Sequence, residues 1–275
     1  MHLGFGLNRL FLNSMHFISI LYRKIILRKK IKSIYFFPDK PTIFDVIYKI
    51  SIWNGYLVAK SQEDADINFH WEDCTFPKAL TDRSFINSQC KSVSKIAVES
   101  SFEKVFGYKL LLDPNNFEGK CVRKNNLNAK HDGKIIDCPI VKLEKGYVYQ
   151  HLINNAIDSR IIEDIRVPFI KNQIPFVYIK YRLISKRFSN ENLYTKIDKV
   201  SNVLSAKETT NIIKVCNNMK LDYCELDIIR DYPEGKLYVV DINHCPSGPP
   251  NHLSFFFTLY AIKQISKTFD EKFGS

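Results

Sequence analysis

The sequence predicts an α+β protein in which antiparallel strand pairs fill the C-terminal two-thirds and a small α/β unit precedes them. Residues 160–183 and 222–243 alternate apolar and polar side chains around short turns, as half-buried antiparallel pairs do. Helical spacing of apolar residues is clearest at residues 205–220. With 275 residues, of which 45% are hydrophobic and 25% charged, the chain can bury one large core or two modest ones.

The individual elements are expected to be short. Gly107 is a natural C-terminal stop for a helix over residues 92–106. Ser205 and Glu208 form an S-x-x-E capping box, which begins a helix ending near Lys220. The other expected elements are strands at residues 33–37, 67–71, 119–124, 134–136 and 146–153, a helix at 44–53, and a polar loop at 125–133.

The hairpin over residues 160–183 has one apolar and one charged face. Its turn is Lys171-Asn172-Gln173, and we expect the strands to pair about Asn172. The charged face is either solvated or part of a site. The expected core face carries Ile161, Ile165, Val167, Phe169, Val177, Ile179 and Leu183, and the other face carries Asp164, Arg166, Tyr178, Lys180 and Arg182.

Positive charge is concentrated at the N-terminus. The net charge is +11, and residues 1–32 contain seven basic residues and no acidic one. No apolar stretch there approaches the roughly 20 residues that span a membrane, and the charges follow the apolar run instead of preceding it as in a secretory signal. A basic amphipathic helix can pack on its own domain or dock on an anionic membrane surface. Its expected apolar stripe is Leu7, Leu10, Phe11, Phe17, Ile18, Leu21, Ile25 and Ile26.

Cysteine usage indicates a reducing compartment. The chain has seven cysteines, an odd number, with no CxxC pair, so neither a disulfide framework nor a zinc site is expected. We therefore expect a cytoplasmic location. The basic N-terminus also allows peripheral contact with the inner membrane surface.

The strongest chemical pattern is the acidic hairpin at residues 222–243. If its strands pair about Glu234, Asp227 lies opposite Asp241 and Glu225 opposite Asn243, all on one face. The other face is then almost wholly apolar, with Cys224, Leu226, Ile228, Tyr238, Val240 and Ile242. Opposed carboxylates repel each other unless a cation or a proton lies between them. Oxygen ligands without sulfur or imidazole favour Mg²⁺ or Mn²⁺, and Mg²⁺ commonly carries phosphate. The alternative is a solvated acidic face, and a one-residue slip in register would separate the two acids.

At these residues the chain resembles the ATP-grasp superfamily, and more narrowly uncharacterised bacterial ATP-grasp proteins. In that superfamily, a carboxylate on one strand and an E/D-x-N triplet on the next hold the magnesium ions of ATP. Asp227, Asp241 and Asn243 match these positions. The resemblance runs from about residue 90 to 260 and includes the segments VFGY, LLLDP, NAKHDG and ENL.

The resemblance implies a fold and a set of site residues. The fold is two α+β subdomains that grip ATP, residues 91–275, preceded by a small α/β domain at 33–90 and a basic arm at 1–32. Lys124 resembles the lysine that holds ATP phosphates, and the loop after it resembles the mobile loop that closes over them. Further implied nucleotide contacts are Lys95, Lys142 and the hinge Gln150-His151-Leu152-Ile153, and the implied catalytic cations are Arg166, Lys180 and Arg182.

Three functions remain open from the sequence. The resemblance favours a magnesium-dependent carboxylate–amine ligase that works through an acyl phosphate, with a small carboxylate and a small amine as substrates. The first alternative is a kinase for a sugar or alcohol on the same scaffold. The second is a non-catalytic protein that binds through its basic N-terminus. Nucleic acid is not the expected partner, because outside residues 1–32 the chain is only slightly basic.

Overall fold

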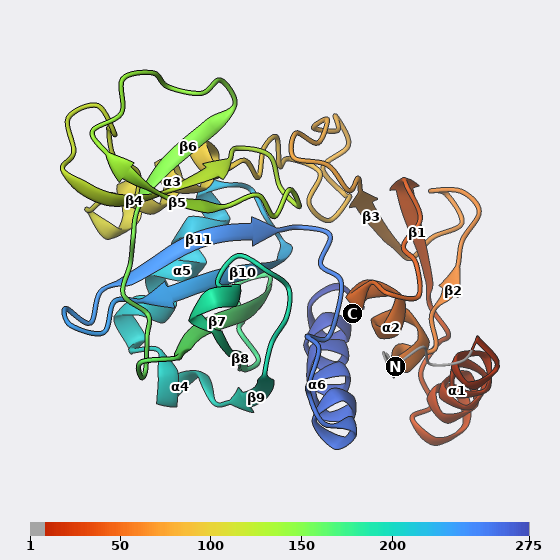
Figure 1. The fold of residues 1–275 in the computed structure, drawn as a ribbon. Coiled ribbons are helices and arrows are strands. Elements are labelled where there is room, and N and C mark those ends of the chain that lie inside the picture. Colours follow the sequence, from red (N-terminus) through yellow and green to blue (C-terminus); the bar gives the residue numbers. More distant parts are fainter. Residues whose placement is uncertain (1–8, 275) are drawn as a thin grey trace.

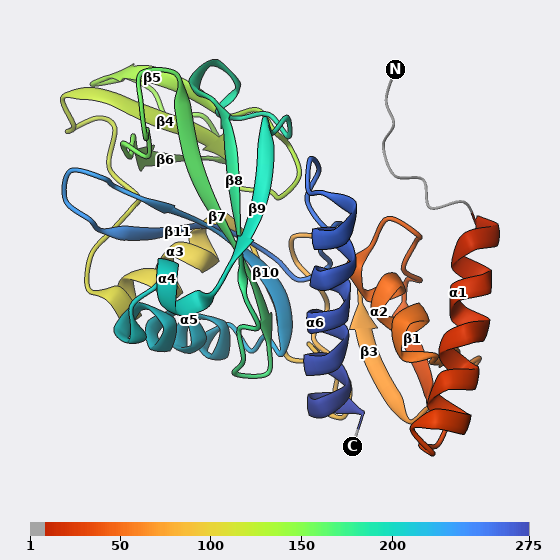
Figure 2. The ribbon, with the colours of Figure 1, turned by 90° about the horizontal axis from the view of Figure 1, so that it is seen from below.

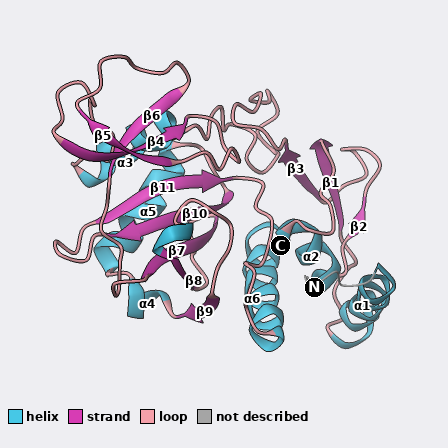
Figure 3. Cartoon of the chain, viewed as in Figure 1, coloured by secondary structure: helices cyan, strands magenta, loops and turns pink. Residues whose placement is uncertain are grey.

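Three β-sheets organise the chain, and the predicted α+β class is confirmed (Figure 1). The computed structural model describes residues 9–274, with side chains from residue 12 onward. Figure 3 shows helices and strands interspersed along most of the chain.

The N-terminal sheet is parallel and has the strand order β2-β1-β3. A helix from the far end of the sequence, α6, shares its core: the rings of Phe69 and Phe269 stack with centroids 6.4 Å apart. Both views place α6 between this sheet and the largest one (Figure 2). The elements of this part are α1 (Arg9–Leu21), the π-helical turn η1 (Tyr22–Ile26), β1 (Ser33–Pro38), α2 (Val46–Asn54), β2 (Leu57–Val58), β3 (Ile67–Trp71) and α6 (Phe255–Phe273).

The largest sheet has five antiparallel strands in the order β11-β10-β7-β8-β9. Its strands are β7 (Ile161–Ile170), β8 (Val177–Leu183), β9 (Tyr194–Asp198), β10 (Tyr223–Arg230) and β11 (Leu237–Asn243). Both predicted hairpin registers are confirmed: Ile161 pairs with Leu183, and Asp227 pairs with Asp241. A register shift just after Asp227 is the exception, because Ile228 then pairs with Val239.

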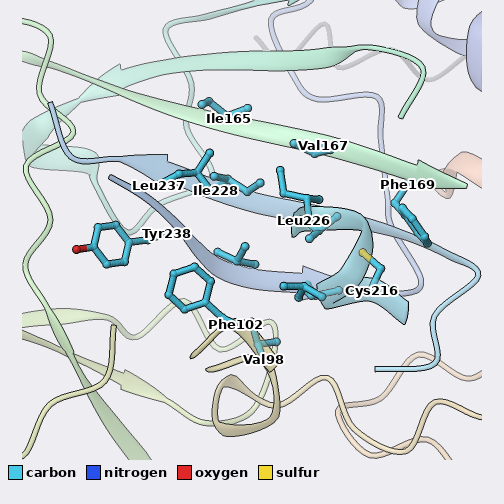
Figure 4. Packing of buried hydrophobic residues seen from close by; sticks show 14 of the residues in the cluster. Val98, Phe102, Ile165, Val167, Phe169, Cys216, Leu226, Ile228, Leu237 and Tyr238 are labelled. Atoms are coloured by element: carbon cyan, nitrogen blue, oxygen red, sulfur yellow. The ribbon is translucent and has the colours of Figure 1, made fainter. Parts of the chain in front are cut away.

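One face of this sheet packs on two helices, α3 (Lys95–Phe106) and α5 (Ala206–Asn218) (Figure 4). Phe102 is fully buried there and stacks on Phe106 with centroids 4.7 Å apart. The predicted capping box begins α5: the Ser205 hydroxyl accepts from the Glu208 N–H, and the Glu208 carboxylate accepts from the Ser205 N–H at 2.8 Å. The helices thus leave the opposite, charged face of the sheet to a different partner.

Over part of this face that partner is the small antiparallel sheet β5-β4-β6, whereas Tyr178 on the same face packs with α6. Its strands are β4 (Gly119–Asn125), β5 (Lys134–Cys138) and β6 (Tyr147–His151), close to the predicted ranges. Two short helical elements, η2 (Ile184–Lys186) and α4 (Val200–Val203), complete the chain.

The N-terminal helix packs with a face other than the predicted stripe. Leu12 is buried and His16 and Ile20 are partly buried, whereas Phe17 and Ile25 are 63% and 62% exposed. Of the two possibilities that the sequence left open for this stripe, packing on the chain's own domain is wrong for Phe17, Ile18, Leu21, Ile25 and Ile26, because α1 docks on α2 through its opposite side. Leu7 and the side chains of Leu10 and Phe11 lie outside the described part of the chain. Within residues 9–274, no helix combines the length and the apolar character of a membrane span.

Candidate functional site

A cavity lies between the small sheet and the charged face of the five-stranded sheet. Seven cationic side chains and four carboxylates line it, so its lining is net positive and suits an anionic ligand. The cations are Lys95, Lys124, Lys130, Arg166, Lys180, Arg182 and Arg187, and the carboxylates are Asp132, Asp164, Asp227 and Asp241.

The carboxylate hairpin supplies the centre of this cavity. Asp227 and Asp241 are directly opposed on β10 and β11, as the hairpin register predicts. Arg166 donates two hydrogen bonds to the Asp227 carboxylate, both at 2.9 Å, and Lys180 Nζ donates a third at 2.6 Å. Although burial opposes ionisation of Asp227, these cations hold its pKa well below the ordinary range.

Asp241 has weaker partners. Its nearest cation is Lys95, with Nζ 3.7 Å from Oδ1, and the Ile242 N–H donates to it at 3.1 Å. Burial raises the pKa of Asp241, and the charge of Asp227 adds to the increase. Asp241 is therefore the member of the pair that a further cation would stabilise most.

Lys124 lies at the end of β4 and faces the same carboxylates. Burial lowers its pKa to about 8, against the opposing effect of Asp241. A buried ammonium group without a partner is costly, and an anion that binds beside it stabilises its charged form.

Arg182 lines the cavity, but both of its terminal guanidinium nitrogens already have partners, and only its buried Nε has none among the described residues. It pairs with Asp164 at 3.2 Å and donates to the carbonyls of Arg187 and Ser189 at 3.2 and 3.0 Å. It thus fixes the segment after β8, including Arg187 and Phe188, which also line the cavity.

The hinge region gives the cavity an apolar wall. Val122 on β4, Ile229 on β10 and Val240 on β11 line it together with Ile153. Val240 was expected on the opposite face with Ile242; the register shift in the hairpin brings it to the cavity. Apolar side chains from two facing sheets can pack against both faces of a flat aromatic group.

The loop after Lys124 closes one side of the cavity. Asn128 donates from Nδ2 to the Ile242 carbonyl at 3.1 Å, and Lys95 Nζ donates to the Leu127 carbonyl at 3.3 Å. The loop also meets the segment after β8, where a Cβ on Gly133 would lie 2.8 Å from the ring of Phe188. Only a glycine fits this contact unless the ring moves.

The structure brings most of the sequence-predicted site residues to this cavity. Lys142 is exposed after β5, and neither it nor Leu152 lines the cavity. Asn243 does not line it either, because its Oδ1 accepts from the Cys245 N–H at 2.9 Å and so turns to the loop. The predicted residues that do line it are Lys95, Lys124, Gln150, His151, Ile153, Arg166, Lys180, Arg182, Asp227 and Asp241.

Some lining residues were not predicted. Lys130, Arg187 and Asn155 come from loops, where no periodic pattern marks an inward side chain. Glu225, which the sequence did place on the face of Asp227, does not line the cavity. It is buried with both oxygens lacking a hydrogen-bond partner among the described residues, and burial raises its pKa to about 7.

The donor set fits magnesium better than a transition metal. Among residues 9–274, no cluster of three His, Cys, Asp or Glu side chains is placed to hold a metal. Mg²⁺ needs only one or two protein carboxylates, because water and phosphate complete its shell. Asp241, with its raised pKa and distant counter-ion, together with Asp227 meets that requirement.

Comparisons with known proteins find similarity in structure alone. No protein-family model matches the chain, and no curated protein matches its sequence. Similar solved structures are ATP-grasp ligases. D-alanine–D-alanine ligase from Bacillus anthracis is 12% identical, with a TM-score of 0.49 over 88% of this chain and 97% of that one. A RiPP-associated ATP-grasp ligase from Chryseobacterium gregarium, solved with ADP and a leader and core peptide, is 13% identical, with a TM-score of 0.49 over 88% and 96%.

A third similar structure is the ATP-grasp ligase PsnB in complex with a minimal precursor. It is 12% identical with a TM-score of 0.43, and the match covers 64% of this chain and 60% of PsnB. This chain thus spans less than two-thirds of the PsnB chain. At such identities and TM-scores, the similarity assigns neither a substrate nor a reaction to this chain.

Proposed function

We propose that this chain is an ATP- and magnesium-dependent ligase of the ATP-grasp type, which activates a carboxylate as an acyl phosphate and joins it to an amine. The observation that carries the proposal is the opposed pair Asp227–Asp241 inside a cavity whose lining is net positive. Paired acids next to surplus cations suit a phosphate chain that arrives with a divalent metal.

The side chains divide into three groups by place. Lys95 and Lys124 lie beside Asp241, where they would hold the phosphates of ATP. Arg166 and Lys180 lie beside Asp227, where they would neutralise the charge of the transferred group. The hinge from Gln150 to Ile153 and the apolar wall would receive the base.

Asp227 and Asp241 are the residues that would hold magnesium. Mg²⁺ held by these two carboxylates would neutralise charge on the phosphate groups as a Lewis acid. Asn243 would join them only by releasing the Cys245 N–H. Mn²⁺ fits the same oxygen donors.

The proposed reaction needs no nucleophilic side chain. An oxygen of the substrate carboxylate attacks the γ-phosphorus of ATP, and the bond from that phosphorus to the β–γ bridging oxygen breaks, which releases ADP. The amine then attacks the acyl carbon of the acyl phosphate, inorganic phosphate leaves, and the amine nitrogen loses a proton. Arg166 and Lys180 would stabilise the charge that develops on the transferred phosphoryl oxygens.

The cysteines fit the cytoplasmic location that we propose for such a ligase. All seven are free in the structure, and the sulfurs of Cys121 and Cys138 lie only 3.1 Å apart. Thiols this close would be prone to oxidation outside a reducing compartment.

Thermal unfolding with nucleotide tests the site. ATP with magnesium at about one hundred times Kd is expected to add about 2.7 kcal/mol of stability, which raises Tm by roughly 5 °C or more. Asp241→Asn should abolish the magnesium-dependent part of this shift. Asp137→Asn removes an exposed carboxylate on β5 outside the cavity and should retain it. Equal shifts in the two variants would contradict the proposed metal site.

Trapping separates a ligase from a kinase. Hydroxylamine attacks acyl phosphates, so a hydroxamate that forms with ATP, magnesium and a panel of small carboxylates supports the ligase. ADP release from alcohols or sugars, without hydroxamate and without a need for an amine, would assign a kinase instead.

A further inference from the structure

From Phe17 to Ile26, the outward face of α1 and of the turn η1 that follows it carries a row of exposed apolar side chains. Phe17 and Ile18 are both 63% exposed, and Ile26 is 64% exposed. Monomeric proteins expose single apolar side chains commonly, but contiguous patches of this kind mark interaction sites. We define this face as the α1 outer face: Phe17, Ile18, Leu21, Tyr22, Ile25 and Ile26, all of them exposed.

The contacts beneath the helix hold this face outward. A Cβ on Gly55 would lie 2.9 Å from the Ile20 backbone nitrogen, so α1 sits directly on the end of α2. The buried Arg23 donates to Asp270 of α6 at 3.0 Å and to the Lys30 carbonyl at 2.9 Å. Rotating the apolar side chains inward would break these contacts.

Cations flank the α1 outer face. Lys24 and Arg28 make no ion pair with any residue in the described range 9–274, and both are exposed. The acidic groups of neighbouring elements are used by other cations: Asp270 of α6 pairs with Arg23 and Lys29, and Asp66 before β3 pairs with Lys30. The free charges beside the apolar face are therefore positive.

We propose that the α1 outer face binds the surface of an anionic membrane, with its apolar side chains in the headgroup–acyl boundary and Lys24 and Arg28 on lipid phosphates. Interfacial helices combine these two features, an apolar face of Phe and aliphatic residues with Lys and Arg beside it. A second copy of the chain fits this face less well, because a twofold contact would bring the same cations together.

Such docking leaves the cavity accessible. Figures 1 and 2 both place α1 at the end of the molecule away from the small sheet β5-β4-β6, with α2 and α6 between them. Membrane binding and nucleotide binding can therefore be measured separately.

Vesicle co-sedimentation of the full chain tests the proposal. The probes are phosphatidylcholine vesicles with and without about one-third phosphatidylglycerol, in about 0.1 M salt so that surface charges are only partly screened. We expect the wild type to bind the anionic vesicles. Ile18→Gln with Ile25→Gln should weaken binding at least about tenfold, since apolar insertion supplies much of the affinity.

Two further variants complete the design. Lys24→Gln with Arg28→Gln should remove the preference for anionic vesicles. Val141→Gln with Leu143→Gln is the matched control, because these side chains are 97% and 53% exposed on a loop elsewhere; it should bind like the wild type. All variants should keep the thermal shift with ATP and magnesium if the proposed nucleotide site is correct.

Three results would overturn the proposal. The first is no binding of the wild type to anionic vesicles. The second is an equal loss of binding in the control pair. The third is a wild-type dimer, measured by light scattering, that Ile18→Gln with Ile25→Gln converts to a monomer, because a second copy would then cover the face.

Discussion

Replacement of Asp227 by Asn removes the carboxylate that Arg166 and Lys180 share. Lys180 has only 4% of its side chain exposed and lies 2.6 Å from Asp227, so the variant leaves a buried ammonium group beside a guanidinium. Removing one partner of a fully buried pair costs about 3–5 kcal/mol, and an exposed pair is worth about 1 kcal/mol or less. Because 28% of the Asp227 side chain is exposed, we expect a loss of about 2 kcal/mol.

Asp241→Asn provides the contrast. Its nearest cation is 3.7 Å away, and its pKa is raised, so the folded protein disfavours its charge at neutral pH. A neutral amide at this position should leave the free energy of unfolding unchanged or raise it slightly. The two substitutions change the same chemical group on opposed strands, yet only one should destabilise the fold.

Urea unfolding at pH 7 without nucleotide measures both variants. The difference in ΔG between them should be about 2 kcal/mol, taken from the midpoints at a common m-value. Equal stability of the two variants within about 0.5 kcal/mol, or a stable Asp227→Asn with a destabilised Asp241→Asn, would refute the charge arrangement described here.

Three further predictions concern other parts of the chain. Burial lowers the pKa of Lys124 to about 8, so its positive charge is lost as pH rises through 8. The affinity for ATP, measured by titration calorimetry, should therefore fall in this pH range. Lys124→Arg stays charged and should remove that fall. Asp270→Asn leaves Arg23 without its 3.0 Å partner and should cost about 2 kcal/mol in urea unfolding at pH 7. Since the pKa of Asp270 is lowered, its contribution is present above the unfolded pKa of about 3.9 and is lost as pH falls through the folded value, so the gap to wild type should close in acid. Phe102→Ala removes a fully buried ring and should cost about 3–5 kcal/mol by thermal or urea unfolding, whereas Phe256→Ala, at a position 81% exposed, should cost less than about 0.5 kcal/mol; similar losses in both would contradict the assigned core.

Strand register was the part of the fold that the sequence predicted best. Turn position and alternation together determine which side chains share a face, and this was enough to place Asp227 opposite Asp241 and Ile161 opposite Leu183. The register shift in the acidic hairpin was not predictable in this way, because a bulge adds a residue without changing the apolar composition of the strand. Val240 therefore lines the cavity although alternation assigned it to the core face.

Long-range packing was the part that sequence patterns could not supply. Helix α6 joins the core of a sheet more than 180 residues earlier in the chain, through contacts such as Phe69 with Phe269. For α1, periodicity identified an apolar face but gave no information on what covers it. The helix is held through its other side, where Leu12 is buried and the buried Arg23 just after the helix pairs with Asp270 of α6.

The clamp of Arg166 and Lys180 on Asp227 has a consequence for the order of ligand association. Magnesium alone would have to displace two cations that already neutralise this carboxylate at 2.6–2.9 Å. A nucleotide that binds together with the metal offers both cations new anionic oxygens. Arg166 and Lys180 then keep anionic partners when the metal binds Asp227. Each ligand should then increase the affinity for the other by the same factor, as thermodynamic reciprocity requires. The protein would thus bind the metal and the nucleotide together more tightly than it binds either one alone.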